Sequence, residues 1–234
     1  MNTQQPEAVS RDGEALDVHS IFKTIQGEGP YAGRPAIFIR LAGCNLQCPA
    51  CDTEYTQGRR DMTPPQIVLE LQELTGCHTP LIVITGGEPF RQQIGMLLDY
   101  LFNCGYKVQV ETNGTLTTQA LDSYVYKGLS IVCSPKTALI NSEVATLVTA
   151  YKYVIKHGEV DRETGLPTRA LDHPCSAGRV YRPHPKFPAN RIYIQPLDEG
   201  HAGRNRMNVL TAIESCQRFG YIFCLQIHKI INLP

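Results

Sequence analysis

Residues 43–53 read Gly43-Cys44-Asn45-Leu46-Gln47-Cys48-Pro49-Ala50-Cys51-Asp52-Thr53. Three residues and then two separate the cysteines, so one short loop can present three thiolates to a compact metal centre. Thiolates are the usual ligands of iron–sulfur clusters, whereas a structural zinc ion takes four ligands. The nearest further candidates, Cys77 and His78, follow a predicted helical stretch. We therefore expect a 4Fe-4S cluster with one open iron. The alternatives are a structural zinc knuckle that uses a distant fourth ligand, or three free thiols.

The chain has 234 residues and a formal net charge of zero. This length predicts a single domain, which we place at residues 18–234, after a polar, aperiodic and flexible tail at residues 1–17. The neutral balance argues against nucleic-acid and membrane-surface partners. Nine cysteines, without a leader pattern or a long apolar run, predict a reducing, cytoplasmic setting.

Short apolar stretches alternate with helical patterns, which predicts an α/β fold with a parallel sheet. Polar and glycine residues fall just past the carboxyl ends of these strands, where α/β folds build their sites. About six core strands are too few to close a barrel, so we expect a partial, open βα barrel. The predicted core strands are residues 36–42, 81–85, 106–110, 129–133, 151–155 and 191–194, with outer strands at 18–24 and 221–227.

Two charged residues before the cysteines are candidates for ligand binding. Glu28 lies between two glycines, and its carboxylate can accept two parallel N–H bonds from a flat, guanidine-like edge. A glutamate in a tight turn facing water fits this segment too. Arg40 interrupts an apolar strand and needs an anionic partner, because burying a lone charge is costly. That partner is either a structural glutamate or the carboxylate of a ligand.

The cysteine spacing after an apolar strand resembles the radical S-adenosylmethionine (SAM) superfamily. Further motifs resemble the 7-carboxy-7-deazaguanine synthase family within it, over most of residues 18–234 but only thinly across 159–190. Ala50 departs from the aromatic residue usual in the superfamily, so a stacking partner for adenine is missing. The motifs are Phe22-Lys23-Thr24-Ile25-Gln26-Gly27-Glu28-Gly29, Thr85-Gly86-Gly87-Glu88-Pro89, Glu111-Thr112-Asn113-Gly114, Gln195-Pro196-Leu197-Asp198 and Gln226-Ile227-His228-Lys229 through Pro234.

This resemblance implies a reaction in which a 5′-deoxyadenosyl radical from SAM abstracts hydrogen from C6 of 6-carboxy-5,6,7,8-tetrahydropterin. The ring contracts, ammonia leaves and 7-carboxy-7-deazaguanine forms, a precursor of queuosine. SAM is regenerated and a magnesium ion (Mg2+) assists. The resemblance further implies a homodimer and an electron donor such as flavodoxin.

The resemblance also assigns roles to residues of this chain. The cluster ligands are Cys44, Cys48 and Cys51, and the magnesium ligand is Thr53. The implied substrate contacts are Ile25, Gln26, Gly27, Glu28, Arg40, Thr112, His228 and Pro234. The implied SAM contacts are Ala50, Cys51, Asp52, Gly86, Gly87, Glu88, Gly114, Ser134, Lys136, Ile155, Lys156, His157, Gln195, Pro196, Leu197 and Asp198.

Two other functions fit part of these motifs. An activase that places a glycyl radical on a partner protein shares the cluster and SAM, but has no need for Glu28 and Arg40 to hold a pterin. A zinc-binding module without enzymatic activity needs only the cysteines. Pterin binding separates the first alternative from the synthase, and metal analysis separates the second.

Overall fold

A computed structural model of the chain describes residues 2–10, 12–76, 80–174 and 178–234. Cys77 and His78, considered above as distant ligands, lie outside the described residues. The strands are β1 (Leu16–Ile25), β2 (Pro35–Leu41), β3 (Arg60–Met62), β4 (Leu81–Gly86), β5 (Lys107–Thr112), β6 (Ser130–Cys133), β7 (Ala150–Ile155), β8 (Ile192–Pro196) and β9 (Ile222–Phe223). The helices are α1 (Pro64–Leu74), α2 (Gly95–Asn103), α3 (Leu121–Tyr126), α4 (Ser142–Leu147), α5 (Ala202–Phe219) and α6 (Ile227–Ile230), with 3-10 turns η1 (Gly29–Tyr31), η2 (Pro89–Arg91) and η3 (Ala189–Arg191).

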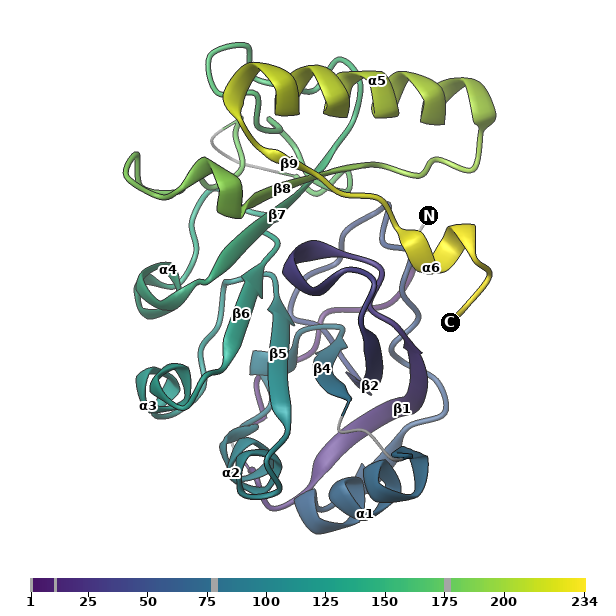
Figure 1. Cartoon of the computed structure of the whole chain (residues 1–234), viewed down its shortest axis with the longest axis vertical. Helices are drawn as coiled ribbons and strands as arrows, with labels where there is room; N and C mark the ends of the chain where they lie inside the picture. The colour runs from purple at the N-terminus through teal and green to yellow at the C-terminus, as the bar shows by residue number, and fades with distance from the viewer. Residues whose placement is uncertain (1, 11, 77–79, 175–177) are drawn as a thin grey trace.

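The described strands form one open sheet in the order β3-β1-β2-β4-β5-β6-β7-β8-β9. Every neighbouring pair from β2 to β9 is parallel, and β1 pairs antiparallel with β2 and β3. Helices α1 to α5 follow one another around the outside of the curved sheet (Figure 1). The expected partial, open α/β barrel is therefore confirmed, and the six predicted core strands correspond to β2, β4, β5, β6, β7 and β8.

The apolar sequence of β4 explains its central place in the sheet. Leu81, Ile82, Val83 and Ile84 are all buried, as expected for a parallel strand covered on both faces. Its β-branched side chains pack well on a pleated surface. Helix α1 begins with Pro64 at its first position and buries Ile67 and Leu71 against the sheet. No described helix combines the length and the apolar character needed to cross a lipid bilayer.

Three boundaries differ from the sequence prediction. Strand β1 begins at Leu16, inside the expected tail, and residues 2–10 make hydrogen bonds to the cysteine loop. Strand β9 ends at Phe223, because the chain leaves the sheet and Ile227 N donates instead to Gly27 O at 3.2 Å. Helix α5 begins at Ala202, whereas the sequence predicts a helix over residues 208–219. Its first turns are mostly exposed, so they carry no apolar periodicity.

Candidate active site

The carboxyl ends of the parallel strands surround a cavity of about 280 Å³, near the lower end of the range for small-molecule sites. The cysteine loop, the ends of β4 to β8 and the C-terminal residues all contribute to its wall. The lining includes most of the residues singled out from the sequence: Ile25, Gln26, Glu28, Arg40, Cys44, Cys48, Ala50, Cys51, Asp52, Thr53, Gly86, Gly87, Thr112, Ser134, Lys136, Gln195, Leu197, Asp198, His228 and Pro234.

The three cysteines line this cavity together, with Cys44 and Cys48 buried and Cys51 half-buried. Burial raises the pKa of Cys44 to about 12 and that of Cys48 to about 11, and a nearby positive charge such as that of iron favours the thiolates. Within the described ranges, no three Cys, His, Asp or Glu side chains converge on a point that could hold one metal ion. A cluster, in which each thiolate binds a different iron, does not require the three sulfurs to converge on one point.

Two further groups in the wall are arranged to receive a polar ligand. Lys136 is half-buried, and its Nζ donates to the carbonyl and hydroxyl oxygens of Ser134 at 2.7 and 2.6 Å. Burial lowers the pKa of Lys136, which the Cys48 thiol opposes. Gln195 Oε1 is buried and accepts no hydrogen bond from any residue that the structure describes. Because a buried acceptor is nearly always satisfied, this oxygen fits a hydroxyl or amine of a bound molecule.

Glu28 lies in the same wall, in an ion pair that the sequence did not predict. Its carboxylate accepts hydrogen bonds from Lys152 Nζ and, at 2.9 Å, from Gln226 Nε2. Burial alone would raise the pKa of Glu28, but the Lys152 ammonium holds it below its usual value. In turn, burial would lower the pKa of Lys152, and Glu28 together with Glu111 raises it. Glu28 is therefore a buried, ionised acceptor.

Arg40 offers the cavity a hydrogen-bond donor that has no acceptor among the described residues. Its Nε is buried and makes no hydrogen bond within the described part of the chain. Its guanidinium lies over the Phe22 ring, with Cζ 5.2 Å from the ring centroid. Burial lowers the pKa of Arg40, and the carboxylates of Asp52 and Glu111 oppose this change. The structural-glutamate partner considered above is not bonded here, so the arrangement favours a ligand anion.

The end of the chain closes one side of the cavity. Thr24 Oγ1 donates to Pro234 O at 2.8 Å, which places Pro234 beside β1. Lys229 Nζ reaches Asp52 Oδ2 at 2.8 Å and so connects α6 to the cysteine loop. His228 also lines the cavity. The last residues of the chain therefore lie between β1 and the cysteine loop.

Several predicted SAM contacts on β7 and after it do not line the cavity. Alternation along β7 turns Lys152 and Val154 toward the cavity and leaves Ile155 in the core. Lys156 instead pairs with Asp172 at 3.3 Å, and His157 contacts Thr211 at 2.9 Å. The predicted residues outside the lining are Gly27, Glu88, Gly114, Ile155, Lys156, His157 and Pro196.

The Gly86-Gly87-Glu88 segment serves the protein's own packing. A Cβ on Gly87 would lie 2.0 Å from Gly43 O, so the glycine lets this turn rest directly on the start of the cysteine loop. Glu88 is fully buried and accepts hydrogen bonds from Phe90 N, Thr112 Oγ1 and Asn113 N. Burial raises the pKa of Glu88 to about 7. Gly87 therefore lets the turn pack on the cysteine loop, and the Glu88 side chain joins the ends of β4 and β5.

Sequence reasoning did not name several residues that shape the cavity, among them Glu111, Lys152, Leu171, Gln226 and Lys229. Lys152 carried a usable signal, since it interrupts an apolar strand as Arg40 does. Leu171 carried none, because it comes from the 159–190 region, to which no function was assigned. Its carbonyl accepts from Ala50 N at 3.1 Å, so this region reaches the place where the superfamily's aromatic residue is missing.

Known proteins share both the sequence and the fold. A family model described as the radical SAM superfamily matches residues 38–137. The 7-carboxy-7-deazaguanine synthase of Rhodospirillum rubrum is 40% identical over 227 residues, covering 95% of this chain and 94% of the relative. That of Rickettsia prowazekii is 36% identical over 237 residues, covering 96% and 92%.

The crystal structure of QueE from Escherichia coli superposes with a TM-score of 0.63 over 90% of this chain and 93% of that chain. Its sequence identity is 20%, so this likeness bears on the fold alone. The identity to the two curated relatives, over nearly the whole length, settles the family. The chain belongs to the 7-carboxy-7-deazaguanine synthase family of the radical SAM superfamily.

Proposed function

We propose that this protein is the radical SAM enzyme that converts 6-carboxy-5,6,7,8-tetrahydropterin to 7-carboxy-7-deazaguanine, with loss of ammonia, for queuosine biosynthesis. The observation that carries the proposal is that one cavity holds a positively charged and a negatively charged group. Arg40 offers a buried guanidinium nitrogen without a partner, and Glu28 offers a buried, ionised carboxylate. A carboxylated pterin complements both, and the three cysteines lie in the same wall.

The cluster ligands in this proposal are Cys44, Cys48 and Cys51. When bound, the 4Fe-4S cluster supplies the electron that cleaves SAM to the 5′-deoxyadenosyl radical. The protein's part is to hold SAM beside the cysteines and away from water. Gln195 Oε1 is suited to accept from a ribose hydroxyl, and Lys136 brings a positive charge close to Cys48.

The pterin contacts follow from charge and hydrogen-bonding capacity. Glu28 has lone pairs beyond those used by Lys152 and Gln226, so it can accept N–H bonds from the pyrimidine edge. Arg40 is suited to bind the substrate carboxylate, and His228 adds a polar side chain to the same wall. Thr112 lines the cavity, but its hydroxyl already donates to Glu88 at 2.7 Å, so its contact is through the methyl group or a lone pair.

A magnesium ion, an electron donor and a second subunit complete the proposal. Thr53 lines the cavity, and its hydroxyl donates a long hydrogen bond of 3.4 Å to Asp52 Oδ1. The lone pairs of the Thr53 hydroxyl oxygen are therefore available to Mg2+. Magnesium commonly takes few protein oxygens and keeps several waters. A flavodoxin-type reductant and a homodimer rest on the family resemblance, and a cytoplasmic setting rests on the cysteine content.

The direct test is anaerobic incubation of the purified protein with SAM, a reductant and the tetrahydropterin. We expect a product with the mass of 7-carboxy-7-deazaguanine. A glycyl-radical activase would cleave SAM but bind no pterin, and a zinc module would hold stoichiometric zinc and no iron. SAM cleavage without pterin binding would therefore contradict the substrate assignment while leaving the cluster assignment in place.

Replacing Lys152 by methionine tests the ionised state of Glu28. Without the ammonium, Glu28 stays buried near Glu111, so its pKa should rise and the neutral carboxyl should bind the pterin less well. We expect the KM for the pterin to increase about tenfold, or about 1.4 kcal/mol, without change in SAM cleavage in the absence of pterin. The matched control is Lys23→Met, an exposed lysine on β1. Equal KM values for both variants would contradict the role of Lys152.

Extending the chain beyond Pro234 tests the closed side of the cavity. Added residues would begin at the cavity wall, where Pro234 O accepts from Thr24. We expect the affinity for the pterin to fall about tenfold, as measured by equilibrium binding. The affinity of the same extended protein for SAM serves as the control and should stay at the wild-type value. Unchanged binding by the C-terminally extended protein would remove Pro234 from the site.

A further inference from the structure

The described N-terminal residues 2–10 lie against the loop that carries the cysteines. Asn2 N donates to Pro49 O at 2.9 Å, and Asn2 Nδ2 donates to Cys48 O at 3.2 Å. Glu7 N donates to Cys44 O at 2.7 Å. Two of the three cysteines therefore have their carbonyl groups bonded to this segment, and none of these donors comes from the sheet.

Gln4 binds the far end of the same loop with both ends of its side-chain amide. Its Nε2 donates to Thr53 O at 2.9 Å, and its Oε1 accepts from Tyr55 N at 2.9 Å. Such paired contacts with one stretch of backbone fix its position more tightly than a single bond. Gln4 and Glu7 thus hold the two ends of the loop, on either side of the cysteines.

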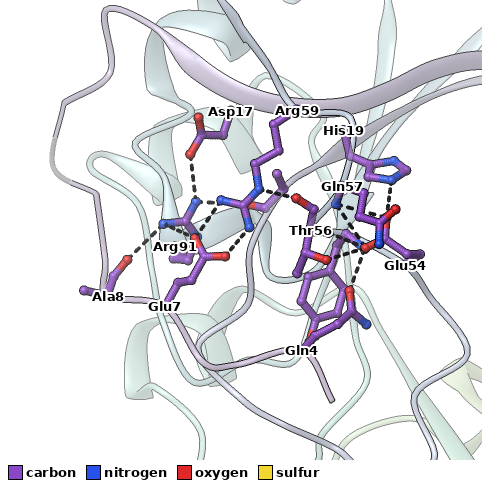
Figure 2. A network of polar contacts seen from close by, with 12 residues as sticks. Gln4, Glu7, Ala8, Asp17, His19, Glu54, Thr56, Gln57, Arg59 and Arg91 are labelled. Carbon is purple, nitrogen blue, oxygen red and sulfur yellow. Dashed lines mark hydrogen bonds and ion pairs between the residues drawn. The ribbon is translucent and has the colours of Figure 1, made fainter. Parts of the chain in front are cut away.

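Glu7 also anchors the segment to two arginines (Figure 2). Its carboxylate accepts hydrogen bonds from Arg59 and lies 3.6 Å from Arg91 Nη1. Arg91 is 4% exposed and is the last residue of the turn η2 after β4. It donates to Ala8 O and Ala42 O, each at 3.0 Å, while Ser10 N donates to its carbonyl at 2.8 Å. The segment therefore ties the cysteine loop to the neighbouring turn.

Gly43, the residue before the first cysteine, is matched to this arrangement. A Cβ there would lie 2.6 Å from Arg91 Nε and 2.7 Å from Glu7 Oε2. The φ of Gly43 is +78°, which favours glycine independently of these contacts. The side chains that contact the loop, those of Asn2, Gln4 and Glu7, are half-buried, whereas Thr3, Gln5 and Pro6 are exposed. The segment thus presents one side to the loop.

We propose that residues 2–10 form a strap that positions the cysteine loop for cluster binding, with Gln4 and Glu7 as its positioning residues. The strap restricts the loop backbone and covers carbonyl groups that water would otherwise bind. Loosening it allows the thiolates to leave their positions and exposes the iron atoms. The proposal rests on the cluster-binding part of the proposed function and is independent of the identity of the substrate.

The test compares two strap variants with two matched controls in the full-length protein. Gln4→Ala and Glu7→Gln remove one side chain and one charge from the strap. Gln5→Ala and Glu14→Gln make the same kinds of change at exposed positions. After anaerobic reconstitution, the rate of iron release to a chelator is measured without SAM or substrate, together with hydrogen exchange of residues 44–55.

We expect Gln4→Ala and Glu7→Gln to release iron about tenfold faster than wild type, in the range seen when groups that orient metal ligands are removed. Exchange in residues 44–55 should quicken, while Gln5→Ala and Glu14→Gln behave as wild type. High ionic strength should speed iron release from the wild type more than from Glu7→Gln, because only the wild type has the ion pairs to screen. A merely structural defect would not give this difference in salt dependence.

Release rates equal to wild type in both strap variants would overturn the strap proposal and leave the proposed function intact. Failure of the wild-type protein to take up iron at all would instead contradict the cluster assignment itself. Equal salt dependence in the wild type and Glu7→Gln would overturn the role given to the Glu7 charge. The three results therefore test the strap, the cluster ligands and the Glu7 charge separately.

Discussion

The Cys51→Ala protein is expected to hold no stable 4Fe-4S cluster and to form 5′-deoxyadenosine at least about 10³-fold more slowly than the wild type. The reason is the number of ligands in the cavity. Among the described residues that line it, the cysteines are Cys44, Cys48 and Cys51. Without Cys51 a second iron loses its protein ligand, and a cluster with two open irons is labile.

Iron analysis and the visible absorption band of the reconstituted protein measure the first effect, and product formation from SAM measures the second. Cys104→Ala is the matched control, because Cys104 is an exposed free cysteine at the end of α2. It should retain the iron content and SAM cleavage of the wild type. A Cys51→Ala protein with a full complement of iron would mean that another side chain is the third ligand.

Replacing Arg40 by alanine is expected to raise the KM for the pterin about a hundredfold, or about 2.8 kcal/mol at 1.4 kcal/mol per factor of ten. A buried guanidinium that meets a substrate carboxylate makes charge-assisted hydrogen bonds, which are among the stronger ones. Arg40 is half-buried and its Nε is already buried without a partner, so part of its desolvation precedes substrate binding. The substrate therefore gains most of the attraction between the charges.

Arg40→Lys should restore only part of this affinity, because an ammonium lacks the planar fork that binds a carboxylate through two bonds. Arg34→Ala is the control, since Arg34 is exposed and stacks on Tyr31 with Cζ 5.3 Å from the ring centroid. Binding of SAM should be unchanged in all three variants. A pterin KM that stays at the wild-type value in Arg40→Ala would mean that the substrate carboxylate binds elsewhere.

Together the two experiments divide the cavity into its functions. Cys51 lies on the cluster side, and its removal should affect SAM cleavage with or without pterin. Arg40 lies on β2, and its removal should affect only reactions that include the pterin. A protein in which both changes had the same effect on SAM cleavage would not fit the separation of the two sides.

The local sequence determined the cysteine triad, the alternation of strands and helices, and the rim where strand ends meet. These features follow from the spacing and periodicity of nearby residues. The repeats of the helix and the strand fix that periodicity locally, so it can be recognised without knowledge of the fold. Arg40 could be found in the same way, because a charge within an apolar strand is unusual at any position. Lys152 offered the same signal on β7, where the prediction chose Ile155 instead.

Only the tertiary structure decided which residues far apart in the chain meet at that rim. Lys152 and Glu28 are 124 positions apart, and Thr24 and Pro234 are 210 apart. Residues 2–10 look like a free tail in the sequence because they carry no apolar periodicity. Their partners are mainly backbone carbonyls of the cysteine loop, which apolar side chains do not bind. Hydrogen bonds to a distant backbone require no pattern in the segment that makes them, so only the folded chain reveals them.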